Sequence, residues 1–144
     1  MKVKSILATK GTNVITIRPE QPVKDAVILL AKYDIGVLVV VNEAGELAGI
    51  ISERDIIRVA ARGEDVLSQA VSQVMTKDVI TGVPQDELTS VAHTMTEKRF
   101  RHLPIIDKGK LVGIISIRDV MEAQRDQYQG EVDTLQTQII ADDD

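Results

Sequence analysis

Two heptapeptides in this chain place a hydroxyl and a carboxylate three residues apart. Residues 49–55 read GIISERD and residues 113–119 read GIISIRD, so the two stretches differ at one position of seven. In each, a Ser precedes an Asp at the spacing of a helix capping box, in which the Ser accepts hydrogen bonds from backbone N–H groups at the start of a helix. This structural interpretation of Ser52, Asp55, Ser116 and Asp119 needs no ligand.

The same residue types can also bind a polar ligand. A helix N-terminus beside a hydroxyl favours anions, because its N–H groups and the helix dipole point outward. An Asp one turn into the helix can accept hydrogen bonds from two vicinal hydroxyls. Both copies also keep Gly-Ile-Ile before the Ser, which a cap does not require, and a glycine in a strand lets another group approach the backbone closely. Capping, ligand binding and a combination of the two therefore all remain open.

The heptapeptides belong to a tandem repeat, which is the most informative feature of the sequence. Gly45–Ile56 matches Gly109–Val120 at an offset of 64, with eight of twelve positions identical. Upstream segments align at an offset of 65 instead. A turn at 42–45, one residue longer than the turn at 107–109, absorbs the difference.

Each copy predicts the order strand, helix, strand, strand, helix. Short β-branched stretches begin each copy, amphipathic helices with apolar residues at helical spacing follow, and two strands joined by a Gly-containing turn lead into a second helix. The first strand must join the sheet after a helical crossover. Because units of about sixty residues are marginal alone, we expect them to share an interface. The predicted strands are 14–17, 36–41, 47–52, 79–82, 103–107 and 111–116, the helices are 23–31, 53–63, 88–95 and 117–129, and 64–74 is a short helical linker.

Composition and charge narrow the function classes. The chain has one Phe, two Tyr and no Trp, which makes nucleic-acid binding on stacked aromatic side chains improbable. It has no Cys, so disulfides and thiolate metal sites are excluded. The net charge of −5 comes from the tail, because the first 125 residues carry 17 bases and 16 acids. A generally basic nucleic-acid surface is not predicted.

Catalysis and membrane insertion are not indicated either. The sequence lacks the usual phosphate-binding, dinucleotide-binding and zinc-protease motifs, and neither Ser has an adjacent base that would activate it. We therefore expect no enzyme, no metal and no required cofactor. No secretion signal and no apolar stretch near eighteen residues is present, so a cytoplasmic protein without membrane contact is expected.

The duplicated unit resembles a tandem pair of CBS domains, also called a Bateman module. The resemblance rests on the shared Gly-x-x-Ser-x-Arg-Asp endings, on SQVMTKDVIT before the second copy and on RFRHLPIID within it, and it spans about residues 1–125. It implies an α/β (α+β) fold of two β-α-β-β-α repeats with pseudo-two-fold symmetry and sheets packed together. The repeats would be 1–65 and 66–125, followed by an acidic tail at 126–144. It also implies disk-like dimers and adenosine-containing ligands in clefts between the repeats.

The resemblance places the Ser of each motif near phosphate and the Asp on ribose, with each cleft completed by the other repeat. We expect the first cleft to bind phosphate, because the only dense basic cluster of the body, at 98–102, would contribute to it. The alternative for this cluster is a solvated strand edge. The residues implied for the first cleft are Ser52, Arg54, Asp55, Met75, Lys77, Val79, Ile80, Arg101, His102 and Pro104.

The second cleft departs from its twin. Gly36 and Val37 stand where the other repeat has Arg101 and His102, and neither binds phosphate through its side chain. We therefore expect this cleft to hold adenosine, a less charged ligand, or nothing. Lys2, Lys4 and Lys10 otherwise read as a solvated N-terminal segment. The residues implied for the second cleft are Lys10, Asn13, Val14, Ile15, Gly36, Val37, Ser116, Arg118 and Asp119.

The function expected from this resemblance is that of a regulatory sensor for AMP, ADP, ATP or a related adenosine compound. Its output would pass through a rearranged homodimer or through a separate regulated protein. The rival hypothesis is a scaffold or oligomerisation module with vestigial clefts. The tail carries Val132, Leu135 and Ile139 at helical spacing, which fits either a short helix packed on a partner or a frayed end.

Overall fold

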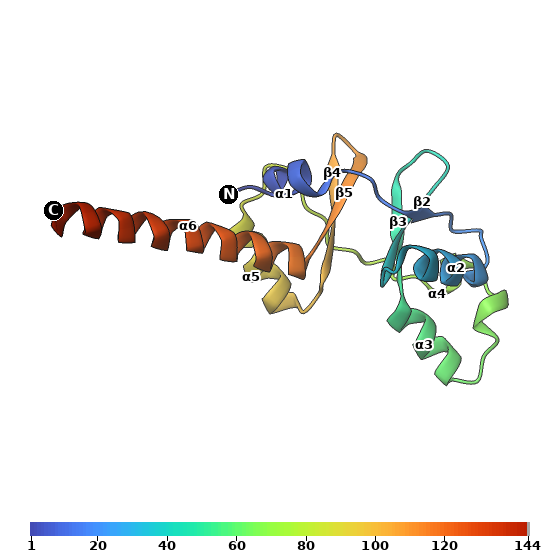
Figure 1. Ribbon diagram of the computed structural model, residues 1–144. Helices are drawn as coiled ribbons and strands as arrows, with labels where there is room; N and C mark the ends of the chain where they lie inside the picture. The colour runs from blue at the N-terminus through green and yellow to red at the C-terminus, as the bar shows by residue number, and fades with distance from the viewer. Residues whose placement is uncertain (144) are drawn as a thin grey trace.

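The computed structural model describes the backbone of residues 1–143 and the side chains of residues 1–130. Its elements form two sheets, with strand orders β1-β2-β3 and β4-β5. Figure 1 shows the two sheets next to each other in the middle of the molecule, with helices on the outer sides. The elements are α1 (Val3–Lys10), β1 (Thr16–Ile17), α2 (Val23–Tyr33), β2 (Val37–Val41), β3 (Leu47–Ser52), α3 (Glu53–Ala61), the 3-10 turn η1 (Val66–Ser68), α4 (Val71–Val74), α5 (Leu88–Lys98), β4 (His102–Asp107), β5 (Lys110–Ser116) and α6 (Ile117–Asp143).

The first half has the predicted order of elements. After the crossover through α2, β1 pairs in parallel with β2, and β2 pairs antiparallel with β3. Side chains alternate toward the core on β3, where Ile51 is fully buried, and β2 is buried along almost its whole length. The strand expected at 14–17 is shorter than predicted, since only Thr16 and Ile17 are paired as a strand.

The second half lacks one predicted strand. Residues 79–82 form no strand, and the segment makes a single parallel bridge, from Gly82 to Ile105. The backbone N–H of Val83 donates to the Asp86 carboxylate, so the chain turns away directly after Gly82. The remaining hairpin is as expected, because β4 and β5 pair antiparallel from His102↔Ser116 to Asp107↔Lys110.

The two hairpin turns explain the change of offset between the repeats. The second hairpin closes with Lys108 and Gly109, both at positive φ, as a two-residue turn of the type that matches strand twist. The first hairpin uses a longer loop, in which the Asn42 side chain accepts hydrogen bonds from the backbone N–H groups of Ala44 and Glu46. The prediction that a turn absorbs the one-residue difference is confirmed.

The N-terminal segment is a helix, which the sequence analysis did not predict. Helix α1 packs into the core of the second half, where Val3, Ile6 and Leu7 join the buried side chains of α5, β4 and β5. The linker helix α4 packs in the same way into the core of the first half. Each half of the molecule therefore completes its core with the helix that precedes the other repeat in the sequence.

The bridges that fix these two helices are also equivalent. An isolated antiparallel bridge joins Lys2 to Glu87 just before α1, and another joins Ala70 to Pro22 just before α4. Glu87 and Pro22 correspond in the repeat alignment at the offset of 65. The exchange of helices thus obeys the same pseudo-symmetry as the rest of the fold.

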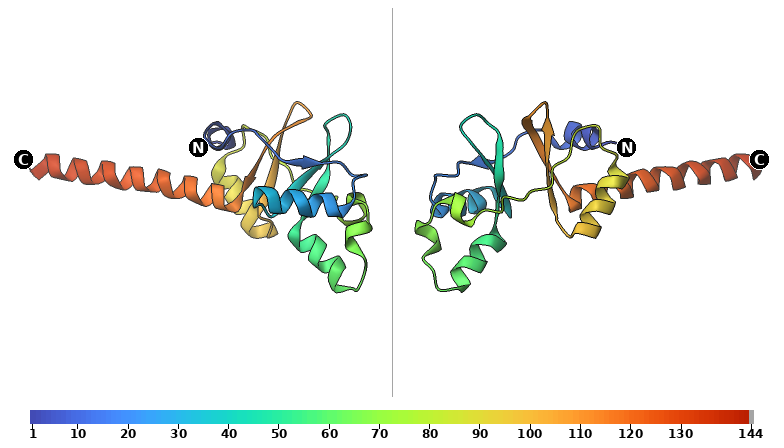
Figure 2. Two further views of the ribbon diagram at one scale, coloured as in Figure 1. Left: turned by 45° about the vertical axis from the view of Figure 1, so that its right-hand side comes forward. Right: turned by 180° about the vertical axis from the view of Figure 1, so that it is seen from behind.

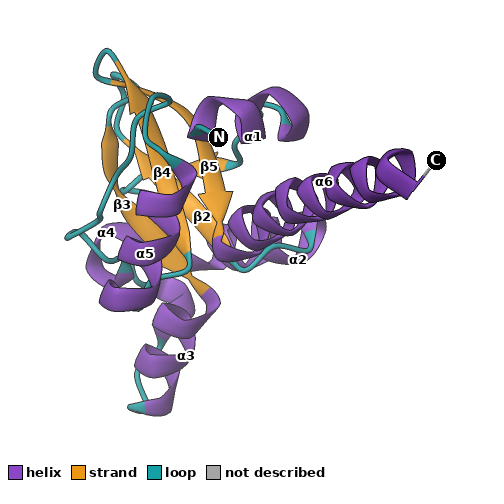
Figure 3. Ribbon diagram, turned by 90° about the vertical axis from the view of Figure 1, so that its left-hand side faces the viewer, coloured by secondary structure: helices purple, strands orange, loops and turns teal. Residues whose placement is uncertain are grey.

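Helix α6 is longer than predicted and extends well beyond the rest of the molecule (Figures 2 and 3). It runs without interruption over 27 residues, which corresponds to about 40 Å at the usual rise per residue. The expected helix at 117–129 therefore continues through the tail as backbone helix. The side chains of Val132, Leu135 and Ile139 lie outside the described residues.

Candidate functional site

The first heptapeptide is a capping box at the start of α3. The Ser52 hydroxyl accepts a hydrogen bond from the Asp55 backbone N–H at 3.2 Å, and the Ser52 backbone N–H donates to Asp55 Oδ2 at 3.0 Å. The Ser52 hydroxyl also donates to the same carboxylate oxygen at 3.0 Å. The structural interpretation of this motif is confirmed, and it fixes the direction of the Asp55 carboxylate.

The other oxygen of this carboxylate is held by a residue from the linker. Thr76 donates its hydroxyl hydrogen to Asp55 Oδ1 at 3.2 Å. Thr76 reaches this position because its backbone pairs with Ile50 on the edge of β3, with both N–H···O bonds between 2.8 and 3.0 Å. The segment that leads into the second repeat therefore lies beside the first motif.

The second heptapeptide forms the same cap at the start of α6. The Ser116 hydroxyl accepts from the Asp119 backbone N–H at 3.1 Å, and the Ser116 backbone N–H donates to Asp119 Oδ2 at 2.8 Å. Here the additional partner of the carboxylate is a cation. Lys10 Nζ lies 2.6 Å from Asp119 Oδ2 and also donates to the Ile114 carbonyl at 3.0 Å.

Lys10 sets the charge state of the second motif. Burial alone would raise the pKa of Asp119, but the hydrogen bond from Lys10, the hydrogen bonds from Ser116 and the Lys10 charge together hold this pKa below its usual value. Asp119 is therefore ionised at neutral pH. Lys10 is exposed, as expected for the N-terminal segment, but it ends helix α1 and its ammonium group pairs with Asp119.

His102 lies next to the second motif. It pairs with Ser116 across the β4–β5 ladder. Its pKa is lowered first by burial and then by the Lys10 and Arg101 charges, while Asp119 raises it. These groups are therefore close enough to act on one another, and a neutral imidazole is favoured beside two permanent cations.

The residues on either side of each cap also belong to their own half. The Arg101 carbonyl accepts the first N–H of α6, from Ile117, at 2.8 Å, and the Gly36 carbonyl accepts the first N–H of α3, from Glu53, at 3.0 Å. Val37 pairs with Ser52 as His102 pairs with Ser116. These contacts place the basic residues beside the second motif, whereas the resemblance assigned them to the first cleft. That grouping of Arg101 and His102 with Asp55 stays a prediction.

The remaining residues of the implied clefts differ in their exposure and in their hydrogen-bond partners. Arg118 is exposed, and its Nε donates to Glu122 at 3.3 Å rather than toward Asp119. Arg54, Lys77 and Asn13 are exposed as well. Pro104 is buried in β4 and accepts from the Gly82 N–H at 2.9 Å. The other members are Met75, Val79, Val14 and Ile15, which are half-buried, and Ile80, which is 41% exposed.

The two motif glycines are confirmed as points of close approach. A Cβ on Gly49 would lie 2.5 Å from the Thr76 carbonyl oxygen and 3.1 Å from Met75 Sδ, and a Cβ on Gly113 would lie 2.6 Å from Leu7 Cδ2. Glycine leaves room for these neighbours as they stand. The glycine shared by the two heptapeptides thus serves packing in both halves.

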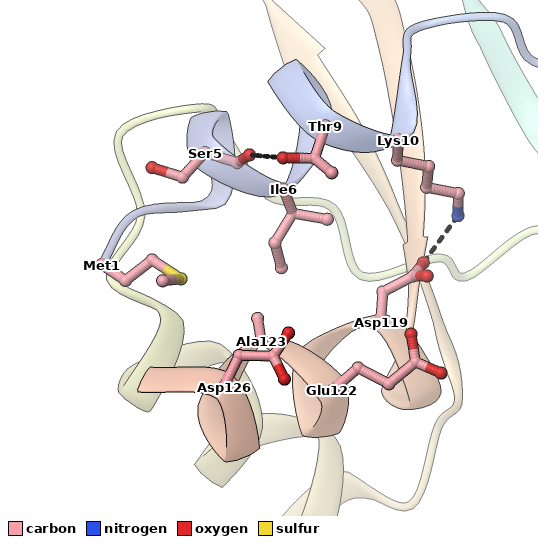
Figure 4. A pocket seen from close by; sticks show the side chains of 9 residues that line it. All are labelled: Met1, Ser5, Ile6, Thr9, Lys10, Asp119, Glu122, Ala123 and Asp126. Carbon is pink, nitrogen blue, oxygen red and sulfur yellow. Dashed lines mark hydrogen bonds and ion pairs between the residues drawn. The ribbon is translucent and has the colours of Figure 1, made fainter. Parts of the chain in front are cut away.

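A pocket of about 450 Å³ opens between α1 and α6, and the Lys10–Asp119 pair forms one of its walls (Figure 4). Ile6 of α1 and Ala123 of α6 lie on opposite sides of it, and Glu122, next to Asp119, and Asp126 line it along α6. The pocket could not be expected from the sequence, because α1 was not predicted. The spacing of Val3, Ile6 and Leu7 was the available signal.

Two further classes of site find no support within the described residues. In that part of the chain, no cluster of three or more His, Asp and Glu side chains is placed to hold a metal ion. The same part contains no helix with the length and apolarity that crossing a membrane requires.

Comparison with protein families gives a match to the CBS domain at residues 3–62 and again at 71–126. Among curated proteins, the CBS domain-containing protein YhcV of Bacillus subtilis is 34% identical over 119 residues, which cover 82% of this chain and 84% of that protein. Among solved structures, the CBS-domain containing protein ATU1752 of Agrobacterium tumefaciens superimposes with a TM-score of 0.81 at 38% identity, over 86% of this chain and 99% of that one.

A second solved structure was determined with ligands. It is the CBS domain pair of protein MJ0100 in complex with 5′-methylthioadenosine and S-adenosyl-L-methionine. It has a TM-score of 0.77 at 27% identity, over 88% of this chain and 98% of that one.

Proposed function

The chain belongs to the CBS-domain family, and we propose that it is a regulatory module that binds an adenosine-containing ligand between its two repeats. The observation that carries the proposal is the matched geometry of Asp55 and Asp119. Each carboxylate is half-buried and is held by a Ser at a helix N-terminus. A carboxylate fixed in this way has lone pairs left for the two hydroxyls of a ribose.

The ligand class follows from the relatives and from the charge of the site. The related pair of protein MJ0100 binds two adenosine compounds, which supports an adenosine group here. We propose AMP, ADP or ATP as the ligand of this chain, because Lys10 pairs with Asp119, the Lys10 and Arg101 charges act on the neighbouring His102, and Arg offers two parallel donors to a phosphate. A co-purified nucleotide, detected by mass spectrometry of the denatured protein, would identify the compound.

The position of the phosphate is the finer part of the proposal. The resemblance places it in the cleft of Ser52 and Asp55, completed by Arg101 and His102. The hydrogen bonds and pairings of Arg101 and His102 instead favour the cleft of Ser116 and Asp119, and we propose that this second cleft receives the phosphate.

Calorimetric titration of AMP against Asp55→Ala and Asp119→Ala decides between the two clefts. Loss of AMP binding only in Asp119→Ala is expected. Loss only in Asp55→Ala would return the phosphate to the first cleft, and full binding by both variants would reject ribose recognition by these carboxylates.

Transmission through a homodimer is supported by an apolar face on the first half. Val27, Ile28 and Ile57 are 37%, 53% and 64% exposed on α2 and α3. Val27 and Ile57 line a pocket of about 350 Å³ between these helices. Apolar surface of this kind marks protein contacts. Ile57→Glu should shift the mass measured by light scattering from dimer to monomer, whereas the exposed-charge variant Arg58→Glu should leave it unchanged.

A scaffold with vestigial clefts is the second candidate, and the projecting helix α6 favours it. Such a helix offers contact surface to a regulated protein without any ligand. Thermal unfolding with a panel of adenosine compounds separates the two functions, because a ligand of the folded state raises the melting temperature by mass action. A shift with any of them supports the sensor, and none at millimolar concentration supports the scaffold.

A further inference from the structure

The two equivalent carboxylates have unequal partners. Beyond its cap, Asp55 is held by the neutral hydroxyl of Thr76 at 3.2 Å. Beyond its cap, Asp119 is held by the ammonium group of Lys10 at 2.6 Å. The repeats therefore share the site but differ in what a ligand has to displace.

A neutral diol can replace the hydroxyl of Thr76 without a net loss, since one hydroxyl-to-carboxylate hydrogen bond is exchanged for another. It cannot replace Lys10 on the same terms. The bond from Lys10 adds the attraction between two opposite charges, and Lys10 would also lose its bond to the Ile114 carbonyl. Its side chain is only 39% exposed, so water compensates it incompletely.

A ligand with an anionic group changes this exchange. Lys10 has a flexible stem, and the charges that act on the neighbouring His102 come from two cations, Lys10 and Arg101, and one anion, Asp119. A phosphate bound there attracts the ammonium group and takes it from Asp119. Oδ2 then keeps its bond from the Ser116 N–H and, together with Oδ1, can accept the ribose hydroxyls of the same ligand.

We propose that Lys10 is an internal latch that makes the second site selective for anionic adenosine ligands. The latch rests on the proposed function, because it assumes that Asp119 recognises a ribose. It assigns to Lys10 a specificity role that its counterpart at the first site, Thr76, does not have. AMP takes Lys10 away from Asp119, whereas adenosine, which lacks the phosphate, has to compete with Lys10 for Oδ2 and binds more weakly.

The test compares AMP with adenosine in an Asp55→Ala background, which leaves the second site alone. With Lys10 present, AMP should bind at least about tenfold more tightly than adenosine. Lys10→Met should abolish this preference, by weakening AMP and by strengthening adenosine. Lys4→Met is the matched control, because it removes an exposed Lys from the same helix, and the preference should persist in it.

The outcomes separate the latch from the proposed function. Binding of neither compound by the wild-type protein would reject the proposed function and the latch together. Two results would reject the latch alone, provided that the wild type binds a ligand. One is an AMP preference that Lys10→Met leaves unchanged. The other is a folded Asp55→Ala variant that does not bind AMP. If Asp55→Ala does not fold, the wild type and Lys10→Met can be compared by NMR, because the backbone amide signals of Ser52 and Ser116 report the two sites separately. Equal adenosine-induced shifts of the Ser116 signal in both proteins would reject the latch.

Discussion

Leu7 and Met75 occupy equivalent positions in the two halves, each lying over the glycine of one heptapeptide. Leu7 covers Gly113 on β5, and Met75 covers Gly49 on β3 together with the Thr76 carbonyl. The two residues are 68 positions apart, whereas the strands that follow are related by 65. The segment from Leu7 to Val14 is therefore three residues longer than the equivalent segment from Met75 to Val79, and Lys10 lies within it.

This relationship predicts different costs for the same substitution. Gly49→Ala brings a methyl group within 2.5 Å of a backbone carbonyl, which moves only if the Ile50–Thr76 bridge moves. Gly113→Ala meets the end of the Leu7 side chain, which can rotate. In denaturant unfolding, the free energy of unfolding should fall by about 3 kcal/mol or more for Gly49→Ala and by about 1 kcal/mol for Gly113→Ala, the range expected for overpacking. Equal losses would contradict this difference.

A second prediction concerns the exchange of helices. Val3 is fully buried in the second half, so Val3→Ala should lower the free energy of unfolding by about 1–3 kcal/mol. Lys4→Ala, on the exposed side of the same helix, should change it by less than about 0.5 kcal/mol. In Val3→Ala, hydrogen exchange should speed up in α5 and β5 before it does in β2. Faster exchange in β2 alone would mean that α1 packs on the first half.

A third prediction follows from the cap of α3. Ser52→Ala removes the acceptor for the Asp55 N–H and should cost about 1 kcal/mol, as for other N-caps. Ser52→Thr keeps the hydroxyl and should recover most of this loss in the same denaturant measurement. A Thr variant as unstable as the Ala variant would show that space, rather than the cap, limits this position.

A fourth prediction is a dependence of stability on pH through His102. Its pKa in the folded protein is below the ordinary value of 6.5, because of burial and the nearby Lys10 and Arg101 charges. As the pH falls, the unfolded chain therefore takes up a proton at His102 before the folded protein does. The contribution of His102 to the free energy of unfolding is complete above pH 6.5 and is lost as the pH falls toward the pKa that His102 has in the folded protein. Unfolding curves at several pH values should show that His102→Gln loses less stability in acid than the wild type does.

His93 provides the control for the pH prediction. Its side chain is 79% exposed on α5 and pairs with Glu97, and His93→Gln, which leaves His102 in place, should still show the acid loss of stability attributed to His102. An identical pH profile for the wild type and His102→Gln would contradict the assignment.

The sequence predicted those parts of the structure whose signals are local. Four strands, the two helices of each repeat and both capping boxes follow from hydrophobic period and from the Ser-x-x-Asp spacing, which act within a few residues. The segment at 79–82 has the composition of a strand, but the turn held by Asp86 begins immediately after it. Composition alone does not reveal where a short segment stops pairing.

The parts that sequence reasoning missed depend on contacts between distant residues. Lys10 and Asp119 are 109 positions apart, and nothing local to either residue indicates the ion pair. The family resemblance placed both in one cleft but could not predict that they bind each other. The docking of α1 on the second half likewise depends on the path of the chain between the sheets.

The exchange of helices also sets the order in which the protein can fold while it is being made. The linker helix α4 meets a first half that has already left the ribosome, so that core can close early. Helix α1 has to wait for Ile115 and Val120, which at usual rates of synthesis takes roughly 5–20 s. During that interval Val3, Ile6 and Leu7 lack the partners that bury them in the folded protein.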